Sequence, residues 1–344
     1  MKSSQEQIEI ATRLLKEENV VAFPTETVFG LGARIDSDPA IKKIFAVKER
    51  PFFDPLIVHV SSIQQAKTCV TDWNTMVQVL TKNFWPGPLT LVLPKSDLIS
   101  DVITSGLLDV GLRWPSHPLA QQLIEAVGVP LAAPSANKFG RTSPTKFEHV
   151  KQEFGAEVFV IESEPSEIGI ESTVLAVSKT INNQLATEHF SLSILRKGFV
   201  TKTKIDDALK SQNLSYDWDQ QRSGQASPGQ MKHHYMPSVP FVICRNPAMK
   251  LSELSKILNS KLSQLPDEIE GVKIIKPKHE ITKIEFLTLS QDPILAARDV
   301  YSQLRAASLR SPQVLCFIQL PTHTGEMWET VFDRLYKAAS LILE

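Results

Sequence analysis

In Val20-Val-Ala-Phe-Pro24-Thr-Glu-Thr-Val-Phe-Gly30-Leu-Gly32, this 344-residue sequence places an apolar run directly before a polar turn. The apolar residues predict a buried strand, and Pro24 breaks that strand into a turn that contains hydroxyls, a carboxylate and two glycines. Polar side chains at the end of a buried strand lie where α/β folds bind their ligands. The stretch therefore predicts an α/β fold with a binding site at the turn.

Two short polar clusters are the next candidates for a site. Lys48-Glu-Arg50 ends a predicted helix, and Ser135-Ala-Asn137 follows a strand-like run at 129–133. If the fold brings the clusters together, two cations lie beside a hydroxyl and an amide, which suits a polyanion such as a nucleoside triphosphate. The alternative is a solvated helix end, favourable beside the helix dipole, and an ordinary Ser/Asn loop. We expect both cations to be accessible, so that removing either barely changes folding.

Apolar periodicity alternates between helix and strand over the first 210 residues. A capping box at Ser4-Gln-Glu-Gln7 predicts the opening helix, with Ile8, Ala11, Leu14 and Leu15 on its inner face. Further helices are expected near 40–48, 62–84, 117–127 and 146–154, and strands near 20–23, 55–60, 89–94, 110–113, 129–133, 157–161, 172–177 and 191–196. Because the last strands leave little room for helices, the pattern predicts an open, twisted mixed sheet with helices packed on it.

The pattern changes after residue 210. Residues 211–238 are rich in Gln, Ser, Asp and Gly and predict a linker, long enough to have a function of its own. From 239 to 344 the sequence predicts a small Rossmann-like domain with three α/β/α layers. Its expected elements are a strand at 239, a helix at 248–264, strands at 272–276 and 285–290, a helix at 292–310, a strand at 314–320 and a helix at 326–343.

Composition limits the class of protein. The 37 basic and 38 acidic residues nearly balance, which argues against a chain that grips nucleic acid through bulk charge. Cys69, Cys244 and Cys316 are few and far apart, so they suggest neither a disulfide framework nor a zinc site and fit a reducing compartment. The start of the chain has no signal-peptide pattern, and no apolar run reaches 18 residues, so we expect a cytoplasmic protein without a membrane segment.

Common nucleotide and metal motifs are missing. Gly30-Leu-Gly32 lacks the third glycine of a dinucleotide fingerprint, and Gly224–Gly229 has the Walker A spacing but is followed by Gln230 and Met231. His233-His234 has no Cys or acidic partner nearby, so a polar linker explains the pair better than a metal site does.

Further motifs follow in order along the chain. They are Pro55-Leu-Ile-Val-His59-Val, Trp85-Pro-Gly-Pro-Leu-Thr-Leu-Val, Gly111-Leu-Arg113-Trp-Pro115, Gly169-Ile-Glu171-Ser172-Thr173-Val174 and Leu195-Arg196-Lys-Gly198. With the turn and the two polar clusters, this series resembles the YrdC-type family, the threonylcarbamoyl-AMP synthases, over about residues 5 to 205. Ser227-Pro-Gly-Gln-Met-Lys-His-His234-Tyr235-Met-Pro237 and the tail resemble the longer, two-domain form of that enzyme.

The resemblance implies a nucleotidyltransferase on an open YrdC-like α/β fold with a large concave cleft. The family reaction joins L-threonine, bicarbonate or CO₂, and ATP into threonylcarbamoyl-AMP and pyrophosphate. Its product supplies the machinery that transfers the threonylcarbamoyl group to tRNA, and direct contact of this chain with tRNA is expected to be weak. Without a carboxylate cage in the sequence, Mg²⁺ is expected to be held mainly by the ATP phosphates.

The resemblance also implies roles for single residues. Lys48 and Arg50 are the expected catalytic cations. The implied ATP-binding set is Lys48, Arg50, Asp54, Ser135, Asn137, Ser143, Arg196 and Tyr235, and the implied threonine-binding set is Thr27, His59, Arg113, Ala133 and Ser172. Chemically, Arg113 suits the substrate carboxylate as a bidentate fork, and Ala133 leaves space for the methyl group. Alternatively, Thr27 and Ser172 are turn or strand-end hydroxyls and His59 is a satisfied strand residue.

Some points stay open at this stage. His59 and Glu26 are both candidates for the base that deprotonates the threonine amine, and proton loss assisted by the substrate fits equally well. The chain departs from the family at Phe29, where Tyr is usual, and at Asp54, where a carboxylate would repel triphosphate unless a cation lies between. Residues 211–238 are expected to close as a lid over ATP, with Tyr235 bonding to or stacking on the nucleotide.

Two rival functions remain. One is an RNA-binding protein that uses the concave surface, against which the balanced charge and the lack of interleaved aromatic and basic residues both argue. The other is an enzyme that handles a different carbamoylated nucleotide on the same fold. The linker and the attached C-terminal domain favour the synthase.

Overall fold

A computed structural model describes residues 3–51, 54–182, 187–219, 234–269, 272–277 and 279–344. The chain forms two compact units. The first takes in Met1–Ala136 and Thr145–Gln230, and the second takes in Asn137–Pro144 and Met231–Glu344. A short stretch in the middle of the first unit's sequence thus belongs to the second unit.

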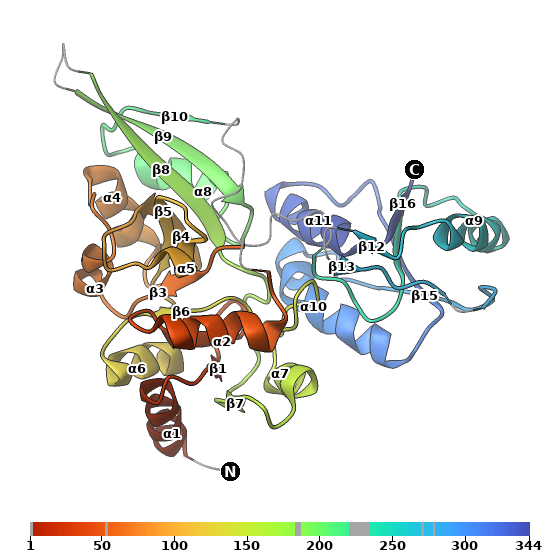
Figure 1. Cartoon of the computed structure of the whole chain (residues 1–344). Coiled ribbons are helices and arrows are strands. Elements are labelled where there is room, and N and C mark those ends of the chain that lie inside the picture. Colours follow the sequence, from red (N-terminus) through yellow and green to blue (C-terminus); the bar gives the residue numbers. More distant parts are fainter. Residues whose placement is uncertain (1–2, 52–53, 183–186, 220–233, 270–271, 278) are drawn as a thin grey trace. The chain divides into compact units, whose positions relative to one another are not determined.

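The first unit is built on a ten-stranded mixed sheet with the strand order β10-β9-β8-β4-β5-β3-β6-β2-β1-β7 (Figure 1). The strands are β1 Val21–Phe23, β2 Gly30–Arg34, β3 Ile57–His59, β4 Leu89–Pro94, β5 Asp109–Arg113, β6 Leu131–Ala132, β7 Phe159–Val160, β8 Thr173–Asn182, β9 Thr187–Arg196 and β10 Tyr216–Trp218. Parallel and antiparallel pairs alternate irregularly across it: β3 pairs with β5 in parallel, for example, but with β6 antiparallel. This confirms the mixed sheet that the sequence predicts.

Helices pack on both faces of this sheet. They are α1 Ser4–Lys16, α2 Asp38–Lys48, α3 Ile63–Thr68, α4 Thr75–Phe84, α5 Asp101–Thr104, α6 Pro118–Val127, α7 Phe147–Phe154 and α8 Lys202–Leu209. The apolar faces of α1 and α6 form one core with β1 and β6, and these two helices lie side by side in Figure 1. The larger core, on the opposite face, contains buried residues of α2, α4 and α8.

The prediction of one helical stretch over 62–84 is wrong in one respect, because the segment forms two helices, α3 and α4. Val70 pairs with Lys95 in an isolated antiparallel bridge, and the Thr71 N–H donates to Pro94 O at 3.0 Å. The chain thus leaves the helix to extend the end of β4. Asn74 then caps α4 by accepting from the Val77 N–H at 3.0 Å.

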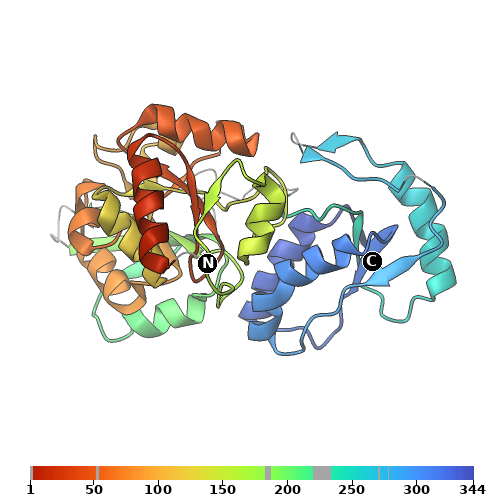
Figure 2. The same ribbon diagram turned by 90° about the horizontal axis from the view of Figure 1, so that it is seen from below.

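The second unit contains a four-stranded parallel sheet with the order β14-β15-β11-β16. Its elements are β11 Phe241–Cys244, α9 Leu251–Ser263, β14 Ile284–Phe286, α10 Pro293–Leu309, β15 Val314–Ile318, α11 Glu326–Ala338 and β16 Leu341–Leu343, with a separate pair β12 Glu268–Ile269 and β13 Val272–Lys273. Helix α9 shares a core with one face of the sheet, while α10 and α11 pack together on the other side (Figure 2). The expected three-layer arrangement is confirmed.

Two elements of the second unit differ from the expectation. The helix predicted over 326–343 ends at Ala338, because Leu341–Leu343 adds to the sheet as edge strand β16 beside β11. The strand predicted over 272–276 is limited to β13, which pairs with β12 instead of joining the parallel sheet. The apolar residues 341–343 fit either a helix or a strand, and pairing with β11 decides for the strand.

The predicted linker 211–238 is only partly described. Residues 216–218 form β10, an edge strand held in place by two side chains that both donate to Asp206: Tyr216 Oη at 3.0 Å and Trp218 Nε1 at 2.9 Å. The proposed turn at Ser227 and the stretch up to His233 lie outside the described residues. The last residues, from His234 onward, pack into the second unit.

Candidate functional site

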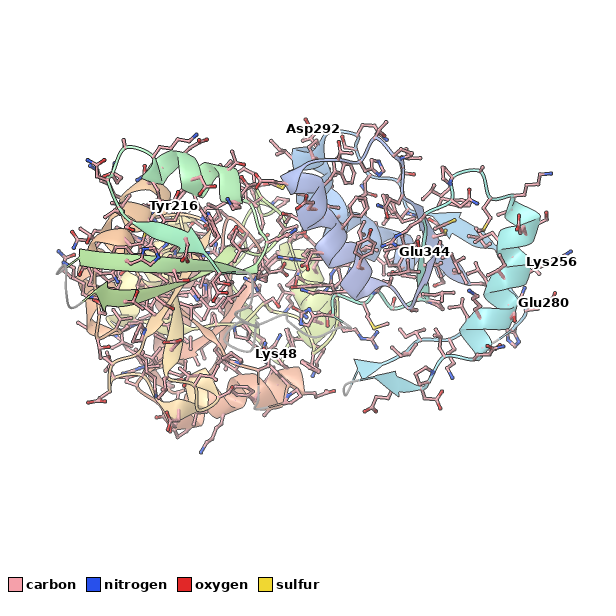
Figure 3. The ribbon with its side chains drawn as sticks, turned by 90° about the horizontal axis from the view of Figure 1, so that it is seen from above. Lys48, Tyr216, Lys256, Glu280, Asp292 and Glu344 are labelled. Carbon is pink, nitrogen blue, oxygen red and sulfur yellow. The ribbon has the colours of Figure 1, made fainter. Side chains whose placement is uncertain are left out.

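The cationic cluster begins where α2 ends. Ser37 caps the start of this helix, and Glu49, in the left-handed region at φ 54°, ends it, with its N–H donating to Ala46 O and Phe45 O. Lys48 occupies the last turn, where the helix dipole favours a cation (Figure 3). Its Nζ donates to Ser135 O at 2.5 Å. The structure thus joins the two polar clusters that the sequence keeps far apart.

The expectation that Lys48 and Arg50 are accessible is wrong. Their relative exposures are 1% and 7%. Arg50 forms an ion pair with Asp54 at 2.8 Å and donates from Nη2 to Asp54 O and Pro55 O at 3.0 Å each. The left-handed turn at Glu49 explains the burial, because it reverses the chain after α2 and folds Arg50 back over the residues that follow it.

Arg196 is the third cation of the cluster. It donates from Nε to Ser172 O and from Nη2 to Ser172 Oγ, both at 3.1 Å. The Ser172 hydroxyl also lies 2.7 Å from Thr90 Oγ1, so three strands converge on this residue. The close approach of the chain after Arg196 to Ser172 and Thr173 requires glycine at position 198, because a Cβ there would lie 2.3 Å from Thr173 N.

Asp54 is the carboxylate around which the three cations act. Burial raises the pKa of Asp54, and the charges of Arg50, Lys48 and Arg196 oppose that rise. A carboxyl in this setting is balanced by cations on the same unit. The repulsion between Asp54 and a triphosphate, expected from the sequence, is therefore reduced by the cations that lie around it.

The Pro24-Thr25-Glu26-Thr27 turn has a rigid polar frame. Thr25 Oγ1 donates to Val28 O at 2.6 Å, accepts from the Val28 N–H at 3.2 Å and lies 2.9 Å from Thr27 Oγ1. From outside the turn, the Ser166 hydroxyl donates to Thr25 O and the Ile168 N–H donates to Glu26 O. Thr27 is completely buried and its hydroxyl belongs to this turn, while its role in binding threonine stays a prediction.

Glu26 forms a buried ion pair with Arg113. The carboxylate Oε1 lies 2.7 Å from Arg113 Nη2, and both side chains are 5% exposed. The contact is short but not aligned as a hydrogen bond: within the described part of the chain, neither Glu26 oxygen and neither Nε nor Nη2 of Arg113 has a hydrogen-bond partner. Such a pair retains donors and an acceptor for a ligand. The sequence motifs include both residues but do not show that they meet.

His59 lies beside this pair in the sheet. It is opposite Arg113 in the β3–β5 register, and the ring of Phe23 meets it edge-on at 6.0 Å. Burial, together with the nearby Arg113 charge, lowers the pKa of His59 to about 3. The imidazole is therefore neutral at pH 7, with Nδ1 3.2 Å from Ile57 O. Ala133, the next member of the predicted threonine set, is fixed by its N–H, which donates to Ile57 O at 2.9 Å.

The other three predicted ATP residues belong to the second unit. Asn137 donates from Nδ2 to Lys138 O and Arg141 O, both at 2.8 Å, and so shapes its own loop. Ser143 is completely buried in the same loop. Tyr235 has a left-handed backbone at φ 65°, and its ring packs against Tyr301 and lies under the guanidinium of Arg334. Its expected stacking on a nucleotide stays a prediction.

Two contributors were missed by the sequence analysis. Thr90 bonds with Ser172, and Thr25 frames the turn, yet neither appears in the predicted site. Thr90 lies inside a quoted motif, in an otherwise apolar strand, and a lone hydroxyl in such a strand is the signal that could have found it. Thr25 gave only the ordinary signal of a turn residue.

Protein groups do not form a metal cage in the described part of the chain. Among those residues, no group of three His, Cys, Asp or Glu side chains is close enough to hold an ion. Asp54, the carboxylate at the cation cluster, is already paired with Arg50. The described helices also include none that is long and apolar enough to cross a membrane.

Comparison with family models matches both parts of the chain. The Sua5_yciO_yrdC model, described as "Telomere recombination", matches residues 13–198. The Sua5_C model, described as the C-terminal domain of threonylcarbamoyl-AMP synthase, matches residues 200–340. The first match covers more than half of the sequence.

Relatives and solved structures agree with the models. The threonylcarbamoyl-AMP synthase of Bacillus subtilis is 40% identical over 256 residues, which are 74% of this chain and 71% of the relative. That of Pyrococcus abyssi is 36% identical over 268 residues, 78% of this chain and 75% of the relative. The structure of P. abyssi Sua5 complexed with L-threonine has a TM-score of 0.78 at 30% identity and covers 100% of this chain and 97% of that one. The chain belongs to the Sua5/YrdC family of threonylcarbamoyl-AMP synthases, in its two-domain form.

Proposed function

We propose that this protein is an L-threonylcarbamoyladenylate synthase that converts L-threonine, bicarbonate or CO₂, and ATP into threonylcarbamoyl-AMP and pyrophosphate. The observation that carries the proposal is that Arg196 connects the proposed ATP residues to the proposed threonine residues. Together with Lys48 and Arg50, it acts on the carboxyl of Asp54 in the ATP set. Its Nη2 also donates to the hydroxyl of Ser172 in the threonine set. The names of the relatives and the threonine complex of the P. abyssi enzyme support it.

The cation cluster would bind the triphosphate. In the reaction, a carbamate oxygen bonds to the α-phosphorus and the bond to pyrophosphate breaks, so negative charge moves onto the leaving group. Lys48 and Arg50 neutralise that charge, and Arg196 orients the nucleotide. Ser135, Asn137, Ser143 and Tyr235 complete the proposed ATP set. The large concave cleft expected from the family stays a prediction and would have to admit the nucleotide.

The Glu26–Arg113 pair would bind threonine. Arg113 takes the substrate carboxylate, and the free oxygen of Glu26 accepts a hydrogen bond from the amine. Since the pKa of His59 is about 3, this imidazole is a poor base at pH 7, which leaves Glu26 or an oxygen of the substrate to accept the amine proton. Thr27 and Ser172 would bond the amine or hydroxyl of the substrate, and Ala133 would leave space for its methyl group.

Magnesium would enter with the nucleotide. Because the described residues form no cage, we propose that the ATP phosphates hold Mg²⁺ and that it supplies charge neutralisation there. We also propose that the reaction takes place in the cytoplasm, and that the product passes to the machinery that modifies tRNA.

The decisive experiment measures pyrophosphate release by the full chain with ATP, bicarbonate and a panel of amino acids. Release that depends on threonine supports the synthase, with serine poorer by about 1–3 kcal/mol in transition-state binding for the missing methyl group. Equal use of serine would show that Ala133 is misplaced. RNA retention without any release would favour the RNA-binding alternative, and release with another carbamoyl donor would favour the other nucleotide enzyme.

A further inference from the structure

The loop Asn137–Pro144 belongs to the second unit, although the residues on either side of it belong to the first. Ser135 and Ala136, directly before it, are tied to the first unit: Gly30 pairs with Ser135, and the Ala136 N–H donates to Phe29 O at 2.8 Å. From Asn137 onward, however, the chain packs with the second unit until Thr145. The loop carries Asn137 and Ser143, two of the proposed ATP-binding residues. The second unit is therefore the part of the protein that sets the conformation of this piece of the ATP site.

A short segment of the second unit grips the loop through the backbone. Arg141 and Met236 form a parallel bridge, in which the Met236 N–H donates to Gly140 O at 2.8 Å and the Thr142 N–H donates to Met236 O at 3.3 Å. The Thr142 hydroxyl donates to Tyr235 O at 2.9 Å. These bonds fix both the N–H and the side chain of Thr142, and they leave its carbonyl as the group that orients the next peptide.

That carbonyl accepts a hydrogen bond from Arg305, a half-buried residue of α10. The Thr142 carbonyl and the Ser143 N–H belong to one rigid peptide plane. Fixing the carbonyl therefore also fixes the direction of the Ser143 N–H and limits the orientation of the Ser143 side chain. A guanidinium is suited to this because a charged donor forms a stronger bond to a carbonyl than a neutral donor does.

We propose that Arg305 is a positioning residue for ATP: from the C-terminal domain, it holds the Thr142–Ser143 peptide in the orientation that binds the nucleotide. The inference rests on the proposed function and deepens it, since it gives the second domain a part in nucleotide affinity. Arg305 acts through the loop and is not assigned a contact with ATP. Its loss would leave the binding groups present but less ordered, so ATP would pay an ordering cost on binding.

The test compares Arg305→Ala with Arg298→Ala in the full chain. Arg298 lies in the same helix, is exposed, and among the described residues pairs only with its neighbour Asp299, so it controls for the loss of one arginine from α10. Calorimetry should show the Kd for ATP rising about five- to tenfold in Arg305→Ala, the scale of the net contribution of one typical hydrogen bond. The Kd for threonine should be unchanged, and Arg298→Ala should match the wild type for both.

Two further variants separate positioning from a general loss of structure. Arg305→Lys retains a donor and should recover part of the ATP affinity. Thr142→Val removes the hydroxyl bond to Tyr235 O, and in a double-mutant cycle with Arg305→Ala the two effects on ATP affinity should be less than additive, because both act on one loop. Unfolding curves check that each variant is folded.

The outcomes distinguish this inference from the proposed function. If the wild type makes no threonine-dependent pyrophosphate, the proposed function fails. If the wild type is active but Arg305→Ala binds ATP as Arg298→Ala does, the function stands and the positioning role is overturned. Equal weakening of ATP and threonine binding would also overturn it, since that pattern indicates a damaged fold and not a misplaced loop.

Discussion

Two buried arginine–carboxylate pairs of the first unit, Arg50–Asp54 and Glu26–Arg113, have nearly equal separations of 2.8 and 2.7 Å but differ in how they are built. Arg50 and Asp54 are four residues apart, and Arg50 also donates to two nearby backbone carbonyls. Glu26 and Arg113 come from distant segments. In the described part of the chain their contact is not aligned as a hydrogen bond, and neither Nε nor Nη2 of Arg113 has an acceptor.

The difference separates a pair held by its own segment from a pair that depends on the fold. The Arg50–Asp54 pair is supported locally and has two further cations, Lys48 and Arg196, acting on its carboxyl. Among the described residues, Arg113 is the only side chain that forms an ion pair with Glu26, and both side chains are buried. Removing one partner of a buried pair leaves the other charge uncompensated, and the pair with no substitute partner should be damaged more.

The largest effect is therefore expected for Arg113. Arg113→Met should lower the free energy of unfolding by about 3–5 kcal/mol, because the Glu26 carboxylate stays buried without its cation. Adding Glu26→Gln to the same chain should recover most of that stability but no threonine binding. Urea unfolding and threonine calorimetry provide the two measurements. A single variant that costs less than about 1 kcal/mol would show that the pair is not desolvated.

A smaller effect, on catalysis more than on stability, is expected for Arg50. Arg50→Ala should cost about 2–4 kcal/mol of transition-state stabilisation, measured as kcat/KM for pyrophosphate release. Its stability loss should be clearly below that of Arg113→Met, because burial already raises the pKa of Asp54 and two cations remain to compensate for its charge. Normal ATP turnover by this variant would remove the cationic cluster from the proposed mechanism. Equal stability losses at Arg50 and Arg113 would contradict the comparison.

The environment of Arg113 can also be tested through His59. The pKa of His59 is about 3 in the folded protein and near 6.5 in the unfolded chain, so between these values only the unfolded chain binds the proton. Stability should be complete above pH 6.5 and fall on acidification, by on the order of 2 kcal/mol between pH 6.5 and 5 from this group. His59→Gln should flatten that slope in unfolding experiments at several pH values. A slope that survives the substitution would assign the acid sensitivity to other groups.

The smallest effect is expected for an exposed pair of the same chemistry. Arg34 donates from Nε and Nη2 to the two oxygens of Asp36 at 2.9 and 2.7 Å, a better alignment than in either buried pair. Because water solvates both charges, Asp36→Asn should change the free energy of unfolding by only about 0.2–1 kcal/mol. Thermal unfolding at low and high salt measures this. A cost comparable to that of Arg113→Met would mean that alignment, and not burial, determines the strength of these pairs.

Much of the fold could be predicted because it follows local patterns. The predicted strand at 20–23 becomes β1 over Val21–Phe23, and the helix at 117–127 becomes α6 over Pro118–Val127. In both cases apolar spacing and flanking prolines are short-range signals. The errors lie where a distant strand competes for the chain. Residues 70–71 extend β4 instead of continuing a helix, and 341–343 join β11.

The candidate site also combines features that local sequence predicts with features that depend on distant segments. Ordered motifs identify Lys48, Arg50, Arg113 and Arg196 as residues of interest, because the motifs follow one another in the order of the family; a cation at a helix end is by itself ordinary. The motifs do not show the burial of Lys48, because its partner carbonyl on Ser135 belongs to a different segment. They also do not show that Glu26 meets Arg113, since pairing across the sheet depends on strand order.

By itself, the sequence determined the two α/β domains, the cationic and amino-acid motifs and the family to which they point, because apolar periodicity and short motifs are encoded within a few neighbouring residues. The tertiary structure alone decided which charges are buried together, how far the pKa of His59 falls, and that the Asn137–Pro144 loop packs with the second unit. The physical reason is that desolvation and charge pairing depend on groups that the fold brings together from distant parts of the chain.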